Sequence, residues 1–138
     1  MERGTFLLFA DLDDLKGIND TLGHLEGDQA LKDIAHILKE TFRDPDILAR
    51  IGGDEFVILA IEGASEAGPE LLVERLRKNL ELSNKESSRP YNLSLSMGAA
   101  GYDPEHPVSI ETLLLEADRN MYEEKHGKRK STQLRIEF

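Results

Sequence analysis

The fold of this chain is decided around one short stretch, Arg50-Ile51-Gly52-Gly53-Asp54-Glu55-Phe56. Apolar runs flank it at residues 47–49 and 56–60. Two adjacent glycines between apolar runs are typical of a β-hairpin turn, because both can adopt positive φ without steric cost. The stretch therefore predicts a hairpin over residues 47–60 that turns at the glycines.

Two acidic residues follow the glycines, at the mouth of a strand that is otherwise suited to burial. Carboxylates are depleted in strands and are costly to bury unpaired. A rigid hairpin that presents the carboxylates of Asp54 and Glu55 is well placed to hold a divalent metal. A solvated turn that happens to be acidic explains this segment equally well.

A second acidic segment follows the first apolar run of the chain. Residues 5–10 read Thr-Phe-Leu-Leu-Phe-Ala, the pattern of a strand buried on both faces. The next residues place Asp11, Asp13 and Asp14 at its carboxyl end. Mg²⁺ takes oxygen ligands and usually only one or two protein carboxylates, so Asp11 and Asp54 together would suffice. The alternative is a helix start with acidic residues in its first turn, which does not exclude a metal.

Together the two segments resemble the signatures of the GGDEF family, whose members are diguanylate cyclases that join two GTP molecules into cyclic di-GMP. The first signature is similar to residues 11–28, and its matching positions are Asp11, Asp13, Lys16, Asn19, Asp20, Gly23, His24, Gly27 and Asp28. The second is the stretch 50–56. The resemblance extends from about Thr5 to Arg129, with the two motifs in the family's order and separation. Two long motifs together are highly specific.

The resemblance implies a role for each residue of the acidic cluster. Asp11 and Asp54 are expected as side-chain ligands of Mg²⁺ or Mn²⁺, and Leu12 as a ligand through its backbone carbonyl. Glu55 either assists the metal or takes the proton of the attacking 3′-hydroxyl, and the sequence leaves both roles open. Lys16 is placed where a cation meets the charge that develops on the phosphates.

The match also implies where guanine binds. A carboxylate at Asp28 can accept from N1–H and the exocyclic amine, and the Asn19 amide can donate to N3 or accept from that amine. Adenine lacks this pair of donors and would be rejected. The alternative role for Asp28 is the N-cap of the following helix. His24 either contacts the nucleotide or packs within a loop.

Two further pairs match family positions. Lys125 and Arg129 match the basic pair that binds the β- and γ-phosphates. The local order departs from the family pattern, because the glycine comes one position early, at Gly127, and Lys128 stands where the family has the glycine. Arg43 and Asp46 resemble the family's inhibitory Arg-x-x-Asp site for cyclic di-GMP. The alternative there is an ordinary loop between a helix and a strand.

Composition bounds the class of protein. With 138 residues the chain predicts one domain, and a formal net charge of −10 argues against DNA as a partner. The absence of cysteine excludes disulfides and thiolate metal sites. No apolar run approaches the roughly 18 residues of a membrane span. We expect a cytoplasmic domain without membrane contact, as the cytoplasmic part of a larger membrane-bound or soluble sensor.

The remaining pattern predicts an α/β fold with strands and helices alternating. Helices are expected at 28–43, 70–82 and 109–125, a loop at 83–90, and strands at 5–10, 92–97 and 132–138 besides the hairpin. The resemblance sharpens this to a mostly antiparallel five-stranded sheet covered by helices, similar to nucleotidyl cyclase catalytic domains and the polymerase palm.

The resemblance also predicts features outside residues 1–138. The family's preceding helix, with its Asp-x-Leu-Thr and Asn-Arg signatures, is not found here, so we expect a fragment of a multidomain protein with sensory or regulatory domains attached. Each GTP site is half an active centre, so activity requires a homodimer. A non-catalytic module that binds GTP or cyclic di-GMP is the alternative. Retention of both hairpin carboxylates favours the enzyme.

Overall fold

The computed structural model describes residues 5–42, 47–61 and 68–136. In chain order the elements are β1 (Thr5–Leu12), α1 (Leu15–Leu22), α2 (His24–Thr41), β2 (Ile47–Arg50), β3 (Glu55–Ile61), α3 (Gly68–Glu86), β4 (Leu95–Gly101) and α4 (Ile110–Ile136). The strands form one sheet in the order β2-β3-β1-β4, and each neighbouring pair is antiparallel. The α/β architecture predicted from the sequence is confirmed.

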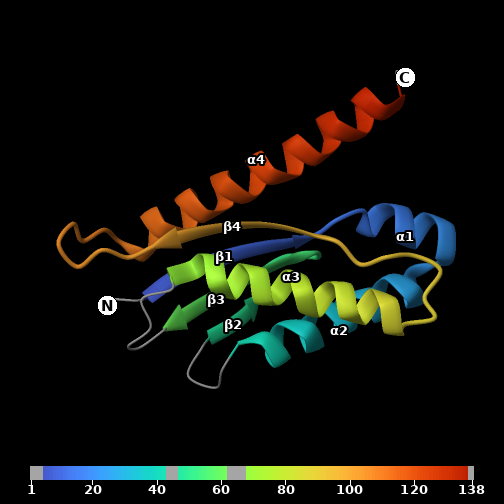
Figure 1. Ribbon diagram of the computed structural model, residues 1–138, viewed down its shortest axis with the longest axis horizontal. Coiled ribbons are helices and arrows are strands. Elements are labelled where there is room, and N and C mark those ends of the chain that lie inside the picture. The colour runs from blue at the N-terminus through green and yellow to red at the C-terminus, as the bar shows by residue number, and fades with distance from the viewer. Residues whose placement is uncertain (1–4, 43–46, 62–67, 137–138) are drawn as a thin grey trace.

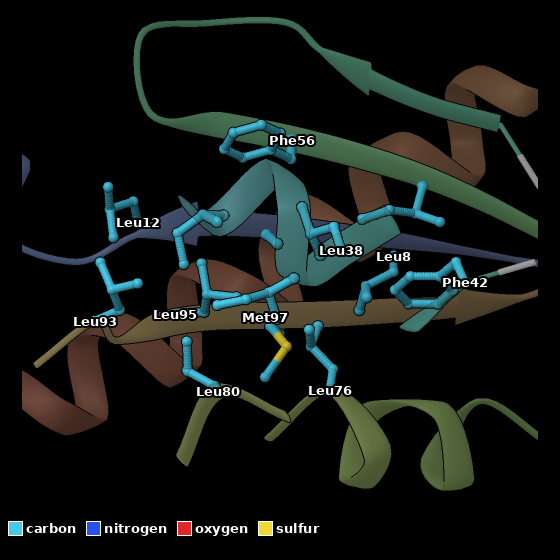
Figure 2. Close-up of a cluster of buried hydrophobic side chains, with 14 of the residues drawn as sticks. Leu8, Leu12, Leu38, Phe42, Phe56, Leu76, Leu80, Leu93, Leu95 and Met97 are labelled. Atoms are coloured by element: carbon cyan, nitrogen blue, oxygen red, sulfur yellow. The ribbon is translucent and has the colours of Figure 1, made fainter. Parts of the chain in front are cut away.

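The sheet is covered on both faces, by α2 and α3 on one side and α4 on the other (Figure 1). Side chains of β1 alternate between the two layers: Leu8 packs with α2 and α3, whereas Leu7 and Phe9 pack with α4. Figure 2 shows the larger cluster, in which Leu38 of α2 and Leu76 of α3 meet the strands. All eight residues of β1 are buried, which confirms that its continuous apolar run marks a strand covered on both faces.

Helix α4 lies against β4 at a close backbone approach. A Cβ on Gly98 would overlap the backbone N of Met121 and the carbonyl oxygen of Ala117, so only glycine allows this contact. The Asn120 Nδ2 donates to the carbonyl of Ala99 at 2.9 Å. These contacts fix where the basic residues of α4 project.

The prediction of a fifth strand at residues 132–138 is wrong, because the described sheet has four strands and residues 132–136 continue α4. Apolar and polar residues alternate there, but Gln, Leu, Arg and Ile extend an existing helix at little cost. Helix α3 likewise runs to Glu86 through part of the expected loop, and β4 begins at Leu95 rather than at residue 92. After Pro69, in the first turn of α3, the next proline is Pro90, so none interrupts the rest of the helix.

The expected hairpin is present, but its turn differs from the expectation. Positive φ among the described residues occurs only at Asp14 and Gly23, so neither Gly52 nor Gly53 adopts it. Residues 51–54 connect β2 to β3, and this longer connection does not require a two-residue turn with positive φ. The Arg50 side chain donates to the carbonyls of both glycines, at 3.1 and 2.8 Å, and so holds the connection in shape.

A short helix that the sequence pattern did not reveal, α1, precedes α2. Gly23, with φ of 94°, separates the two helices, and its N–H donates to the carbonyl of Asn19 at 2.9 Å. Helix α2 therefore begins at His24, and Asp28 lies inside it rather than at its N-cap. The capping role considered for Asp28 is wrong.

Candidate active site

The two acidic segments of the sequence meet at one end of the central strands. β1 and β3 pair with Asp11 opposite Glu55, and the Leu12 N–H donates to the carbonyl of Asp54 at 2.9 Å. One carboxylate oxygen from each of Asp11, Asp54 and Glu55 lies within 4.8 Å of the others. The structure thus brings together three residues that the sequence predicted for the metal and the chemistry.

Asp11 is the most deeply buried member of this cluster. It is 6% exposed, and its Oδ2 accepts a hydrogen bond from the Lys125 Nζ at 2.7 Å. Within the described part of the chain, its Oδ1 is buried without a hydrogen-bond partner. Burial raises the pKa of Asp11 to about 6; Lys125 opposes the rise and Asp54 adds to it.

A divalent cation would satisfy what this cluster lacks. Among the described residues the Oδ1 of Asp11 has no donor, and the neighbouring carboxylates of Asp54 and Glu55 add negative charge beside it. The donor set is oxygen only, which suits Mg²⁺ or Mn²⁺ rather than softer metals. The residues present therefore fit the metal that the sequence predicted.

A cavity of about 340 Å³ opens beside the carboxylates. Its lining residues are Leu15, Lys16, Asn19, Asp20, His24, Gly53 and Asp54. Lys16 and Asn19 are three apart on α1 and so share one face of that helix. The structure places Lys16, Asn19 and His24 in one cavity with Asp54, as a nucleotide pocket beside the metal would require.

Asp28 does not line this cavity. It is exposed in α2 and lines a second hollow of about 500 Å³ with residues that include Lys32, Arg50 and Phe56. Its neighbour Gly27 lies against Asn19, which lines the first cavity. The contact expected between Asp28 and guanine stays a prediction.

One basic residue of α4, Lys125, reaches the acidic cluster. Lys125 bonds Asp11, as described, and its side chain is 21% exposed. The side chain of Arg129 and both residues of the predicted inhibitory pair, Arg43 and Asp46, lie outside the described part of the chain. Their roles stay predictions.

Sequence reasoning missed a polar network around Asp13. Its carboxylate accepts hydrogen bonds from the hydroxyls of Ser94 and Ser96 at 2.6 and 2.7 Å and from the Lys128 Nζ at 2.9 Å. Lys128 also donates to the carbonyl of Leu95 at 2.6 Å. Burial opposes ionisation of Asp13, but the three hydrogen bonds prevail and its pKa is lowered. The alternating serines were the only signal in the sequence, and they do not reveal which strand they pair with.

The sequence profile described as "Diguanylate cyclase, GGDEF domain" matches residues 2–131. "Diguanylate cyclase A" of Treponema denticola is 34% identical over 124 residues, which cover 89% of this chain and 33% of that protein. "Cyclic di-GMP phosphodiesterase PdeR" of Escherichia coli is 35% identical over 89% of this chain and 18% of its own length. The chain thus spans a third or less of these relatives.

Solved structures agree with the sequence comparison. A truncated TpbB of Pseudomonas aeruginosa, comprising only the GGDEF domain, superposes with a TM-score of 0.79 at 35% identity, over 89% of this chain and 72% of that one. None of the helices in the described ranges is long and apolar enough to cross a membrane.

Proposed function

This chain belongs to the GGDEF family of diguanylate cyclase domains, and we propose that it condenses two GTP molecules into cyclic di-GMP with release of two pyrophosphates. The observation that carries the proposal is the cluster of Asp11, Asp54 and Glu55, with a buried, unpartnered oxygen on Asp11. A family match by itself does not establish activity, because PdeR, a relative named as a phosphodiesterase, matches equally well.

Asp11 and Asp54 would hold Mg²⁺, together with the carbonyl of Leu12. When bound, the ion would neutralise triphosphate charge and favour ionisation of the 3′-hydroxyl. The 3′-oxygen attacks the α-phosphorus, the bond to pyrophosphate breaks, and the hydroxyl proton leaves. Glu55 lies beside both aspartates, so it serves as a third oxygen ligand or as the acceptor of this proton.

The remaining site residues orient the nucleotide. Lys16 lines the same cavity as Asp54 and would bind phosphate oxygens. Asn19 and Asp28 would read the guanine edge, with His24 at the cavity rim. Lys125 already lies within the acidic cluster, so its ammonium can share its charge between Asp11 and the phosphates. Arg129 would contribute a second cation.

The complete activity requires more than this chain. Each site binds one GTP, so two copies must face each other before both phosphodiester bonds can form. We propose that attached sensory or regulatory domains control this meeting in the cytoplasm, since the chain spans a third or less of the two relatives described above. Arg43 and Asp46 would bind cyclic di-GMP as a product inhibitor.

The alternative is a nucleotide-binding module without catalysis, and a turnover assay separates the two. The chain would be fused to a dimerising coiled coil and incubated with GTP and Mg²⁺, with cyclic di-GMP measured by mass spectrometry. The proposal predicts product from the dimerised wild type and none from dimerised Asp54→Ala. A dimer that binds GTP yet forms no cyclic di-GMP would support the module instead.

A further inference from the structure

The junction of α1 and α2 contains Gly27, and a residue of the candidate site fills the space that a side chain at this position would occupy. Gly27 is buried in the first turns of α2 and faces α1. A Cβ on Gly27 would overlap the Oδ1 of Asn19 and would lie 2.8 Å from its Cγ and 3.4 Å from its Nδ2. The Asn19 amide therefore occupies the volume that any other residue at position 27 would need.

Backbone hydrogen bonds hold both residues in place. The Asn19 carbonyl accepts from the Gly23 N–H at 2.9 Å, and the Gly23 carbonyl accepts from the Gly27 N–H at 3.2 Å. Gly23 takes φ of 94°, which sets the angle between the helices. If a Cβ were added at Gly27, the Asn19 side chain would move rather than the backbone, and it borders the cavity beside Asp54.

We propose that Gly27 is a specificity-determining residue, because its missing Cβ lets the Asn19 amide lie against α2 in the position that reads the 2-amino edge of the purine. The inference rests on the proposed function, since it takes guanine as the base. A displaced amide loses its hydrogen bond to the exocyclic amine, whereas Lys16 and the carboxylates keep their positions. The effect therefore falls on selection of the base rather than on binding of the phosphates.

The fold itself should tolerate a methyl group at this position. The overlap is with the end of a flexible side chain rather than with backbone, and alanine is the better helix former. Gly127→Ala is the matched control, because Gly127 also lies in a helix and nothing surrounds its Cβ position within 4 Å. We expect Gly27→Ala to melt at or above the temperature of the wild type.

The test is calorimetric titration of the full chain, with Mg²⁺, using the α,β-methylene analogues of GTP and ITP. These analogues block the reacting bond, and ITP lacks only the 2-amino group. Loss of one hydrogen bond corresponds to roughly a tenfold preference for GTP in the wild type and in Gly127→Ala. Gly27→Ala should lose most of this preference. The double variant Asn19→Ala/Gly27→Ala should match Asn19→Ala alone, because Gly27 acts through Asn19.

The possible results distinguish failure of this inference from failure of the proposed function on which it rests. A wild type that binds neither analogue overturns the proposed function and the inference with it. A wild type that prefers GTP, with an unchanged preference in Gly27→Ala, overturns the inference alone. Additive effects in the double variant would also overturn it, as would a Gly27→Ala protein that melts well below the wild type, since the overlap would then act on the fold.

Discussion

Asp11 shows at the scale of one residue how chemistry and stability oppose each other. Its carboxylate is buried beside Asp54 and Glu55, and one of its oxygens has no hydrogen-bond donor among the residues that the structure describes. Lys125 compensates for this only in part, because the pKa of Asp11 is still raised to about 6. The ionised form, which a metal needs, is therefore the form that the metal-free fold disfavours.

This opposition predicts a pH dependence of stability in metal-free buffer. Between the ordinary pKa of 3.8 and the folded value of about 6, the folded protein binds more protons at Asp11 than the unfolded chain does. The contribution of Asp11 to the free energy of unfolding therefore falls as pH rises through this window. Asp11→Asn removes that contribution, so the free energy of unfolding of the variant should fall less with rising pH than that of the wild type.

Urea denaturation of both proteins with EDTA, at several pH values from about 4 to about 7, measures this difference. Parallel profiles for the two proteins would show that Asp11 ionises normally in the fold.

The sequence predicts site residues best where the signal is local. Asp11, Asp54 and Glu55 stand at the ends of apolar runs, so short segments are enough to predict them as metal ligands. The partners of Asp13 do not, because Ser94 and Ser96 reach it only through the register of β4 on β1, more than 80 residues away. That register depends on which strands pair, and the pattern of one strand does not specify it.

At the scale of elements, the packing of α4 on β4 determines where the basic residues of the site lie. The helix approaches the strand at Gly98, close to backbone atoms of Ala117 and Met121. One turn further along α4, Lys125 reaches Asp11. A displacement of the helix would therefore move this ammonium away from the carboxylates.

Gly98→Ala should accordingly lose both stability and site geometry. The added methyl group meets backbone atoms of α4, so the helix must shift, and overpacking of this kind costs about 1–3 kcal/mol. Thermal unfolding measures the stability. Gly127→Ala provides the control, since it adds a methyl group to α4 at a position away from the contact with β4. Equal melting temperatures for the two variants would show that α4 does not depend on the glycine contact.

The elements themselves were predictable in kind but not always in extent. The hairpin at 47–60 and the helix starting near 70 follow from local pattern and are present. The segment 132–136 alternates like a strand yet continues α4, because extension of a formed helix outweighs a short alternating pattern. Helix α1 was missed because its eight residues, Leu15–Leu22, give too few turns to show a period.

At the level of the whole molecule, we expect cyclic di-GMP, the product, to inhibit its own synthesis. The pair Arg43 and Asp46 would bind cyclic di-GMP through a guanidinium on a phosphate or base edge and a carboxylate on guanine N1–H. Titration of cyclic di-GMP into the wild type should show micromolar or tighter binding, and Arg43→Ala should weaken it at least tenfold. Arg50→Ala is not a suitable control, because that side chain holds the hairpin.

Lys85→Ala provides a better control for this titration, since it removes an exposed cation at the end of α3. It should bind cyclic di-GMP as the wild type does. Equal affinity in Arg43→Ala and the wild type, or no binding to the wild type, would remove the inhibitory site from the account.

The central claim is that Asp11, Asp54 and Glu55 form a divalent metal site, and Mn²⁺ binding tests it most directly. Electron paramagnetic resonance of free Mn²⁺ would be followed during titration of the chain, with the α,β-methylene analogue of GTP present, for the wild type and Asp54→Ala. We expect saturable Mn²⁺ binding to the wild type and at least a tenfold lower Mn²⁺ affinity in Asp54→Ala. The melting temperature of this variant in EDTA should not fall, because the substitution removes one of three crowded carboxylates. Equal Mn²⁺ affinity in two well-folded proteins would contradict it.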